Sequence, residues 1–164
     1  MKYLIKAGSL YQIDNGRPGT KLACLKSPYF PVKKTILSPD GRIRLFAEIR
    51  PNGNREPMYI LSDSLNQIIL SGSPGHSKNL TILSEPHLNQ IKITLEHRMY
   101  NLFMKNSQEC LMMDENSWVA ARLTHRGTGG GWLLEADPSF SPYILMGLFI
   151  FCRYLDKENE FLTE

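Results

Sequence analysis

The sequence lacks the features on which several protein classes depend. Its three cysteines, Cys24, Cys110 and Cys152, are widely spaced and form no C-x-x-C pair. This spacing excludes a disulfide framework and a zinc knuckle, and it predicts reduced thiols. The first residues, MKYLIK, place only three apolar residues before the next charge, whereas a secretory signal needs an apolar stretch of about 7 to 15 residues. We therefore expect a cytoplasmic protein.

Catalytic and metal-binding motifs are also missing. The histidines show neither H-x-x-x-H nor H-E-x-x-H spacing, and the chain contains no G-x-S-x-G motif and no evident carboxylate pair. The segment RGTGGGW, residues 126–132, resembles a phosphate loop but lacks the Lys-Ser/Thr ending, so it predicts a flexible hairpin connection. We expect no catalytic residue, no metal and no other cofactor, and hence not an enzyme.

The longest apolar run lies near the C-terminus, in SPYILMGLFIFCRYLD, residues 141–156. Its eleven residues from Pro142 to Cys152 are too few to cross a bilayer, which takes about 20 residues, so we expect no transmembrane segment. Ser141 is a favourable N-cap and Pro142 suits the first helical position, which predicts a helix over residues 142–156. Because apolar residues go all the way round this helix, it must be surrounded by the rest of the fold.

The remaining sequence reads as short strands separated by turns. GRIRLFAEIRP alternates, with Ile43, Leu45, Ala47 and Ile49 predicted on one face and the charged residues on the other. About a dozen such runs occur, among them LTILS at residues 80–84. Turn signals separate them, including Asp14-Asn15-Gly16, Pro51-Asn52-Gly53 and Ser73-Pro74-Gly75.

A flat sheet would leave one side of an all-round apolar helix in water. A sheet closed on itself covers every side of the helix and removes its own exposed edges. We therefore predict a mainly β fold: one domain over residues 1–164, built as a closed antiparallel β-barrel of about twelve strands around a central hydrophobic C-terminal helix.

The order of these elements resembles a known family. Hairpins such as YILSDSLNQIILSG, then the Trp-bearing strand GWLLEAD, then the helix PYILMGLFIFCRYLD are similar to the tubby C-terminal-like superfamily, which includes the LURP-one-related proteins and the phospholipid scramblases. Small bacterial members match this length best. The resemblance implies a twelve-stranded barrel around a central helix, and phosphoinositide binding through surface Lys and Arg in the tubby domains. It carries no catalytic residue over to this chain.

Positive charge is concentrated in the first third of the chain. Residues 1–55 hold eleven of the nineteen Lys and Arg and only three of the sixteen acidic residues, which hints at an anionic partner. Arg42, Arg44 and Arg50 have the even spacing that puts side chains on one strand face, with Lys33, Lys34 and Arg55 nearby. Guanidinium groups in a row could grip phosphate oxygens. Alternatively, this face only solubilises the strand, with Glu48 pairing across it.

We expect a binding domain that recognises anionic phospholipid head groups through this basic barrel surface, as a peripheral protein at the cytoplasmic (inner) membrane face. The alternative is a protein-interaction or structural domain that uses the same surface as a rim. Nucleic-acid binding ranks last, because the aromatic residues form no stacking motif among the basic ones. Trp118 and Trp132 are expected at the barrel rim.

Overall fold

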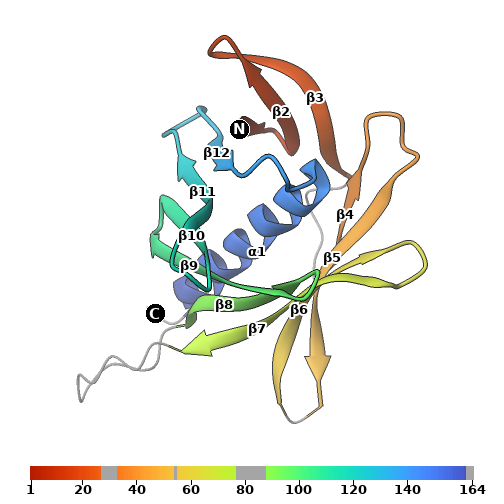
Figure 1. The fold of residues 1–164 in the computed structure, drawn as a ribbon, viewed down its shortest axis with the longest axis vertical. Helices are drawn as coiled ribbons and strands as arrows, with labels where there is room; N and C mark the ends of the chain where they lie inside the picture. Colours follow the sequence, from red (N-terminus) through yellow and green to blue (C-terminus); the bar gives the residue numbers. More distant parts are fainter. Residues whose placement is uncertain (27–32, 54, 77–87, 162–164) are drawn as a thin grey trace.

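The computed structural model describes residues 1–26, 33–53, 55–76 and 88–161. Twelve strands are followed by one helix, in the order seen in Figure 1. The strands are β1 (Lys2–Lys6), β2 (Ser9–Asp14), β3 (Arg17–Lys26), β4 (Lys33–Leu37), β5 (Arg44–Asn52), β6 (Arg55–Asp63), β7 (Ile68–His76), β8 (Leu88–Leu95), β9 (Arg98–Asn106), β10 (Glu109–Asp114), β11 (Val119–His125) and β12 (Trp132–Ala136), and the helix is α1 (Pro142–Phe161).

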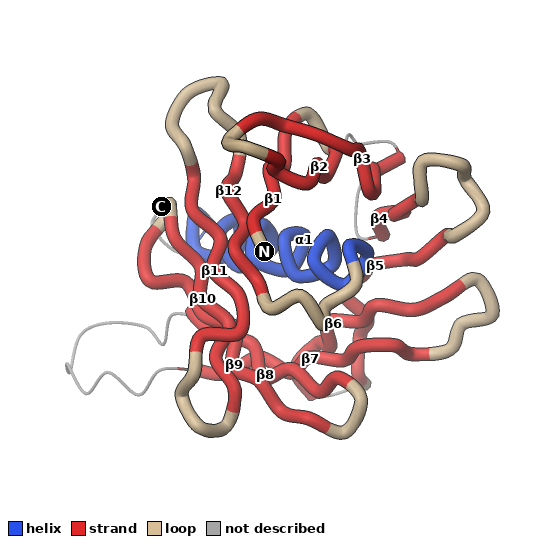
Figure 2. Tube along the Cα trace, turned by 45° about the horizontal axis from the view of Figure 1, so that its top comes forward, coloured by secondary structure: helices blue, strands red, loops and turns tan. Residues whose placement is uncertain are grey.

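The sheet is an antiparallel meander that closes on itself. Each strand pairs with its neighbours in the sequence, and β1 also pairs with β12. In that closing pair Tyr3 lies opposite Leu134, and the N-terminal ammonium group donates a hydrogen bond to the carbonyl oxygen of Ala136 at 2.7 Å. Figure 2 shows the strands arranged around α1. The predicted closed barrel around a central C-terminal helix is thereby confirmed.

The meander gives the barrel two distinct ends. The near end, where α1 begins, carries Met1, the loop 137–141 and the turns that follow β2, β4, β6, β8 and β10. The far end, toward which α1 runs, carries the last residues of β1, β3, β5, β7, β9 and β11. Because every strand reverses direction, a residue's position within its strand decides which end it occupies.

Helix α1 begins at Pro142, as predicted, and continues beyond the predicted end at residue 156 to Phe161. The hydroxyl oxygen of Ser141 accepts a hydrogen bond from the backbone N–H of Ile144 at 3.3 Å, which satisfies one of the unpaired donors of the first turn. The N-cap expected from the sequence is therefore present.

The helix packs closely against the barrel wall. Phe151 is fully buried, and its ring meets that of Tyr59 on β6 edge to face, with 5.5 Å between the ring centroids. A Cβ atom on Gly147 would lie 3.0 Å from a terminal carbon of Leu61, so the absence of a side chain lets the helix approach β6. Phe149 on the same helix is only partly buried, and it lies toward the far end, against Trp132.

Two strand-level predictions are wrong and one cannot be compared. Ile43 is 44% exposed, because β5 begins one residue later and Ile43 belongs to the turn. Ser73-Pro74-Gly75 is no turn but part of β7, where Pro74 lies opposite Ile91 in the ladder with β8. The expected strand LTILS, residues 80–84, lies outside the described residues.

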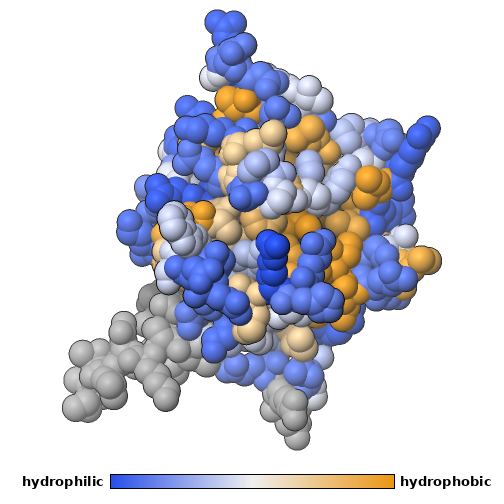
Figure 3. Space-filling model, viewed as in Figure 1, coloured by the Kyte–Doolittle hydropathy of each residue, from blue (hydrophilic) through white to orange (hydrophobic). Residues whose placement is uncertain are grey.

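Large apolar side chains reach the surface at one end of the barrel. All of the exposed large hydrophobic residues among those described lie at the near end: Met1, Ile43, Leu65, Ile68, Met99, Trp118 and Val119. In Figure 1 the hairpins β4–β5 and β6–β7 of this end project to the right. Figure 3, in the same view, shows hydrophobic residues in orange at that margin and near the centre of the face.

Candidate functional site

The predicted basic residues divide between the two ends of the barrel. Arg42 lies in the turn before β5 and Arg44 is the first residue of β5, both at the near end. Arg50 lies near the other end of the same strand. Since a strand rises about 3.3 Å per residue, Arg44 and Arg50 are separated by about 20 Å along the barrel wall. The structure therefore does not bring these arginines together in one site.

Four of the predicted residues do share the far end. Lys33 and Lys34 open β4, Arg50 lies near the end of β5, and Arg55 opens β6. The side chain of Arg55 lies outside the described part of the structure. Lys34 is opposite Ala47 in the β4–β5 ladder, on the same inner face as the buried Ile36, and is itself half-buried.

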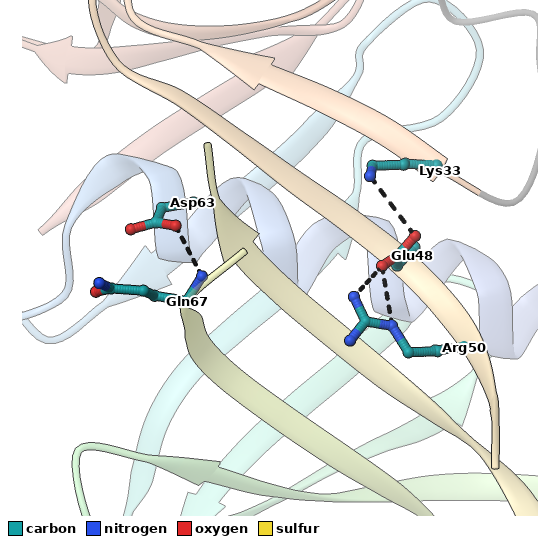
Figure 4. A network of polar contacts seen from close by, with 5 residues as sticks. All are labelled: Lys33, Glu48, Arg50, Asp63 and Gln67. Atoms are coloured by element: carbon teal, nitrogen blue, oxygen red, sulfur yellow. Dashed lines mark hydrogen bonds and ion pairs between the residues drawn. The ribbon is translucent and has the colours of Figure 1, made fainter. Parts of the chain in front are cut away.

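Glu48 joins two of these cations, as Figure 4 shows. Its carboxylate lies 3.9 Å from the ammonium nitrogen of Lys33, and it accepts a hydrogen bond from Nε of Arg50 at 3.2 Å. The ammonium group of Lys33 also lies 4.5 Å from the centroid of the Phe46 ring, a cation–π distance. The pairing of Glu48 with its basic neighbours, considered as an alternative from the sequence, is present. This pairing lowers the net positive charge around Lys33 and Arg50.

Further cations lie at the far end that the sequence analysis did not select. Lys6 ends β1, Lys26 ends β3, and Arg126 directly follows β11. In the barrel order β11–β12–β1–β2–β3–β4–β5, these residues lie in successive hairpins, about 10 Å apart at the usual strand spacing. With Lys33 and Arg50 they make one continuous stretch of the rim, the basic arc: Arg126, Lys6, Lys26, Lys33 and Arg50.

Three members of the arc differ from Lys33 and Arg50, which are paired with Glu48. Lys6, Lys26 and Arg126 form no ion pair with a residue that the structure describes. Farther round the rim the basic residues are paired, because the Glu109 carboxylate lies 3.3 Å from the ammonium nitrogen of Lys105 and 3.6 Å from Nε of Arg122. The sequence could have predicted the arc, because the ends of alternate strands in an antiparallel meander lie on one rim, and basic residues occur at several of these ends.

The loop beside Arg126 is a closed hairpin connection. The N–H of Arg126 donates to the carbonyl oxygen of Gly131 at 2.9 Å, and the N–H of Gly130 donates to that of Gly127 at 3.1 Å. A Cβ atom on Gly131 would lie 3.3 Å from Cβ of Lys6, which shows that this loop and the β1–β2 turn are neighbours. The loop joins two strands, as predicted, and precedes no helix.

Trp132 closes the barrel interior behind this loop. Its ring centroid lies 4.9 Å from that of His125 and 6.0 Å from that of Phe149, and the guanidinium group of Arg153 is 5.8 Å away. Arg153 is in turn hydrogen-bonded to Asp156. Trp132 is thus at the barrel rim as expected, packed inward, whereas Trp118 is at the opposite rim and 76% exposed.

The cysteines show no reactive arrangement. All three are free, and burial, together with the adjacent Cys110 thiol, raises the pKa of the Cys152 thiol well above its ordinary value. A protonated, buried thiol is a poor nucleophile and metal ligand. Among the described residues, no three His, Cys, Asp or Glu side chains gather as a metal ion would require.

Two further findings bear on identity. Within the described part of the chain, no helix is both long and apolar enough to span a bilayer. Comparison with models of known protein families, with curated proteins and with solved structures found no match.

Proposed function

We propose that this protein is a non-catalytic binding domain of the tubby C-terminal-like type, and that its basic arc binds anionic phospholipid head groups at the cytoplasmic membrane face. The closed twelve-stranded barrel around a C-terminal helix supports the family resemblance, because that resemblance implies the same architecture. The single observation that carries the proposal is the basic arc at the far end.

The arrangement of the arc suits a flat, negatively charged surface. Its cations lie in successive hairpins of one rim, so several can approach lipid phosphates in the same orientation. Each basic residue near an anionic bilayer contributes about 1 kcal/mol. Lys6, Lys26 and Arg126 together would then contribute about 3 kcal/mol to reversible peripheral binding, to which Lys33 and Arg50 of the same arc would add. The described residues of this end add no exposed large hydrophobic side chain, so the binding should be mainly electrostatic.

Vesicle co-sedimentation tests the proposal. The purified protein is mixed with phosphatidylcholine vesicles that contain or lack phosphatidylglycerol, at low and high salt. We expect binding only to the anionic vesicles, weakened by salt. The triple variant Lys6→Ala/Lys26→Ala/Arg126→Ala should lose about 100-fold in affinity.

The matched control is Arg42→Ala/Arg44→Ala, which removes two exposed arginines from the near end. It should bind the anionic vesicles like the wild type. Equal losses in both variants would show that net charge rather than the arc is responsible, and absence of binding by the wild type would reject the proposal. If the wild type binds a nucleic acid duplex more tightly than anionic vesicles of the same charge, the arc recognises nucleic acid phosphates rather than lipid head groups.

A further inference from the structure

The near end of the barrel differs chemically from the far end and has a second potential use. Its exposed side chains include Trp118 at 76%, Leu65 at 76%, Ile68 at 55% and Met99 at 50%. Among the described residues every exposed large hydrophobic side chain lies at this end, and exposed apolar residues gathered on one surface mark interaction sites. The vesicle-binding proposal for the basic arc does not use these residues.

The β6–β7 turn, which carries Leu65, and the β10–β11 turn, which carries Trp118, have the same conformation. In β6–β7, Oδ1 of Asp63 accepts hydrogen bonds from the N–H groups of Leu65 and Gln67, at 2.8 and 2.9 Å. The Asp63–Gln67 contact is drawn in Figure 4. In β10–β11, Oδ1 of Asp114 accepts from the N–H groups of Asn116 and Trp118, both at 2.9 Å.

The backbone of the two turns also matches. Asp63 donates to the carbonyl oxygen of Gln67 at 3.0 Å, and Asp114 donates to that of Trp118 at 3.0 Å. The fourth residue of each turn, Asn66 or Ser117, has a positive φ, of 61° and 64°. Because the turns are fixed by several hydrogen bonds, a partner would not have to order them, which lowers the cost of binding.

Three cavities open at the near end, two of them lined in part by residues next to Trp118 in the sequence. One of about 260 Å³ is lined by Arg98, Met99, Tyr100 and residues 114–116. A second, of about 290 Å³, is bordered by Glu96, Ser139 and Phe140 and shares Arg98 and Tyr100 with the first. A third, of about 360 Å³, lies on the other side of the β10–β11 turn, where it is lined by Met1, Val119 and Asp137. Pockets beside an exposed aromatic anchor are typical of protein-binding surfaces.

The charges around the first two cavities are mainly negative, with Glu96, Asp114 and Glu115 against Arg98. The third cavity is mixed, because Lys2 and Arg122 line it together with Glu135 and Asp137. Lys2 is already paired with Glu135 at 2.9 Å. The backbone N–H of Ser139 hydrogen-bonds to the Asp137 carboxylate and holds its pKa below the ordinary value, so this group stays charged. At the first two cavities, which Arg98 and Tyr100 share, an anionic bilayer would be repelled and a cationic partner attracted.

A second copy of the chain fits this end less well. Two near ends would bring like-charged carboxylates together. A near end on a far end would place Trp118 against a rim that, among the described residues, exposes no large hydrophobic side chain. We propose that the near end docks a protein segment that carries lysine or arginine beside large apolar side chains, with Trp118 as the anchor and the two cavities that share Arg98 and Tyr100 receiving the partner's side chains.

Three short synthetic peptides of equal length test this proposal: alternating Leu and Lys, alternating Leu and Glu, and alternating Ser and Lys. Fluorescence anisotropy should show binding of the Leu–Lys peptide, and affinity lower by about tenfold or more for the other two. Amide NMR signals should shift at residues 96–100, 114–119 and 137–140. Trp118→Ala should weaken Leu–Lys binding by about tenfold, without changing the melting temperature because the side chain is exposed.

The matched control is Lys26→Ala at the far end, which should bind the peptide normally. The proposal is overturned if the Ser–Lys peptide binds as well as Leu–Lys, or if the shifted signals lie at the far end. It is also overturned if Trp118 emission shifts to the blue with phosphatidylcholine vesicles, or if Trp118→Ala abolishes a dimer of the wild type. Because Trp118→Ala leaves the basic arc intact, loss of peptide binding and loss of vesicle binding are separate results.

Discussion

Replacing Phe151 by alanine should destabilise the protein more than any other truncation of a single aromatic residue on the helix. Phe151 is fully buried and meets the equally buried Tyr59 edge to face at 5.5 Å. Truncation of a buried Phe costs about 3–5 kcal/mol, which includes the cavity left behind. The lost aromatic pair supports a value near the middle of that range, about 4 kcal/mol. For a chain of this length, that corresponds to a fall in melting temperature of about 8–16 °C.

Urea unfolding followed by tryptophan fluorescence measures this loss. The midpoint should fall while the slope with denaturant stays constant, since the surface exposed on unfolding hardly changes. Phe149→Ala is the matched control, because Phe149 lies on the same helix but is only partly buried. If Phe151→Ala costs no more than Phe149→Ala, the helix is not held at the centre of the barrel. If Phe151→Ala does not fold, Phe151→Leu should give the same ranking with a smaller loss.

The remaining predictions concern the far end and the fit of the helix. Glu48→Gln should raise affinity for anionic vesicles about fivefold, because one negative charge leaves the basic arc; unchanged co-sedimentation would contradict this. Gly147→Val should cost about 1–3 kcal/mol in urea unfolding through its clash with Leu61, and no loss would show that the wall yields. Burial, with a contribution from the Glu48 charge, raises the pKa of Tyr154 from 10.0 to about 12. Its contribution to stability is therefore complete below pH 10.0 and is lost as the pH rises toward 12. Tyr154→Phe should lose less stability than the wild type between about pH 10 and pH 12, and an equal loss would refute the assignment.

The architecture could be predicted because two strong patterns constrain each other. An eleven-residue apolar run without a polar face must be surrounded, and strands of alternating polarity can surround it only by closing. The prediction failed where the residue types favour a turn but the pairing with the next strand continues the sheet. Pro74 and Gly75 read as a turn, yet β7 continues through them because Pro74 faces Ile91 and Gly75 faces Gln90 in the β8 ladder.

The candidate site was harder to predict, because it depends on register and on strand direction. The spacing of Arg42, Arg44 and Arg50 predicts one shared strand face, but Arg50 follows Arg44 by six residues in β5, which places the two at opposite ends of the barrel. Lys34 lies on the inner face because it is paired with Ala47. Lys6 and Lys26, which form no ion pair with a described residue, come within about 10 Å of each other only after the strands β1 to β3 are placed side by side.

The pairing of β1 with β12 has a consequence for how the chain folds. Tyr3 and Leu134 are neighbours in the sheet, although nearly the whole barrel separates them in sequence. During synthesis, β1 emerges first and has only one edge covered until β12 arrives, so it presents unpaired backbone groups throughout the making of the barrel. Contacts of such long sequence separation also slow folding. The last strand to be made therefore controls when the first is protected, and any aggregation of newly made chains should begin at the exposed edge of β1.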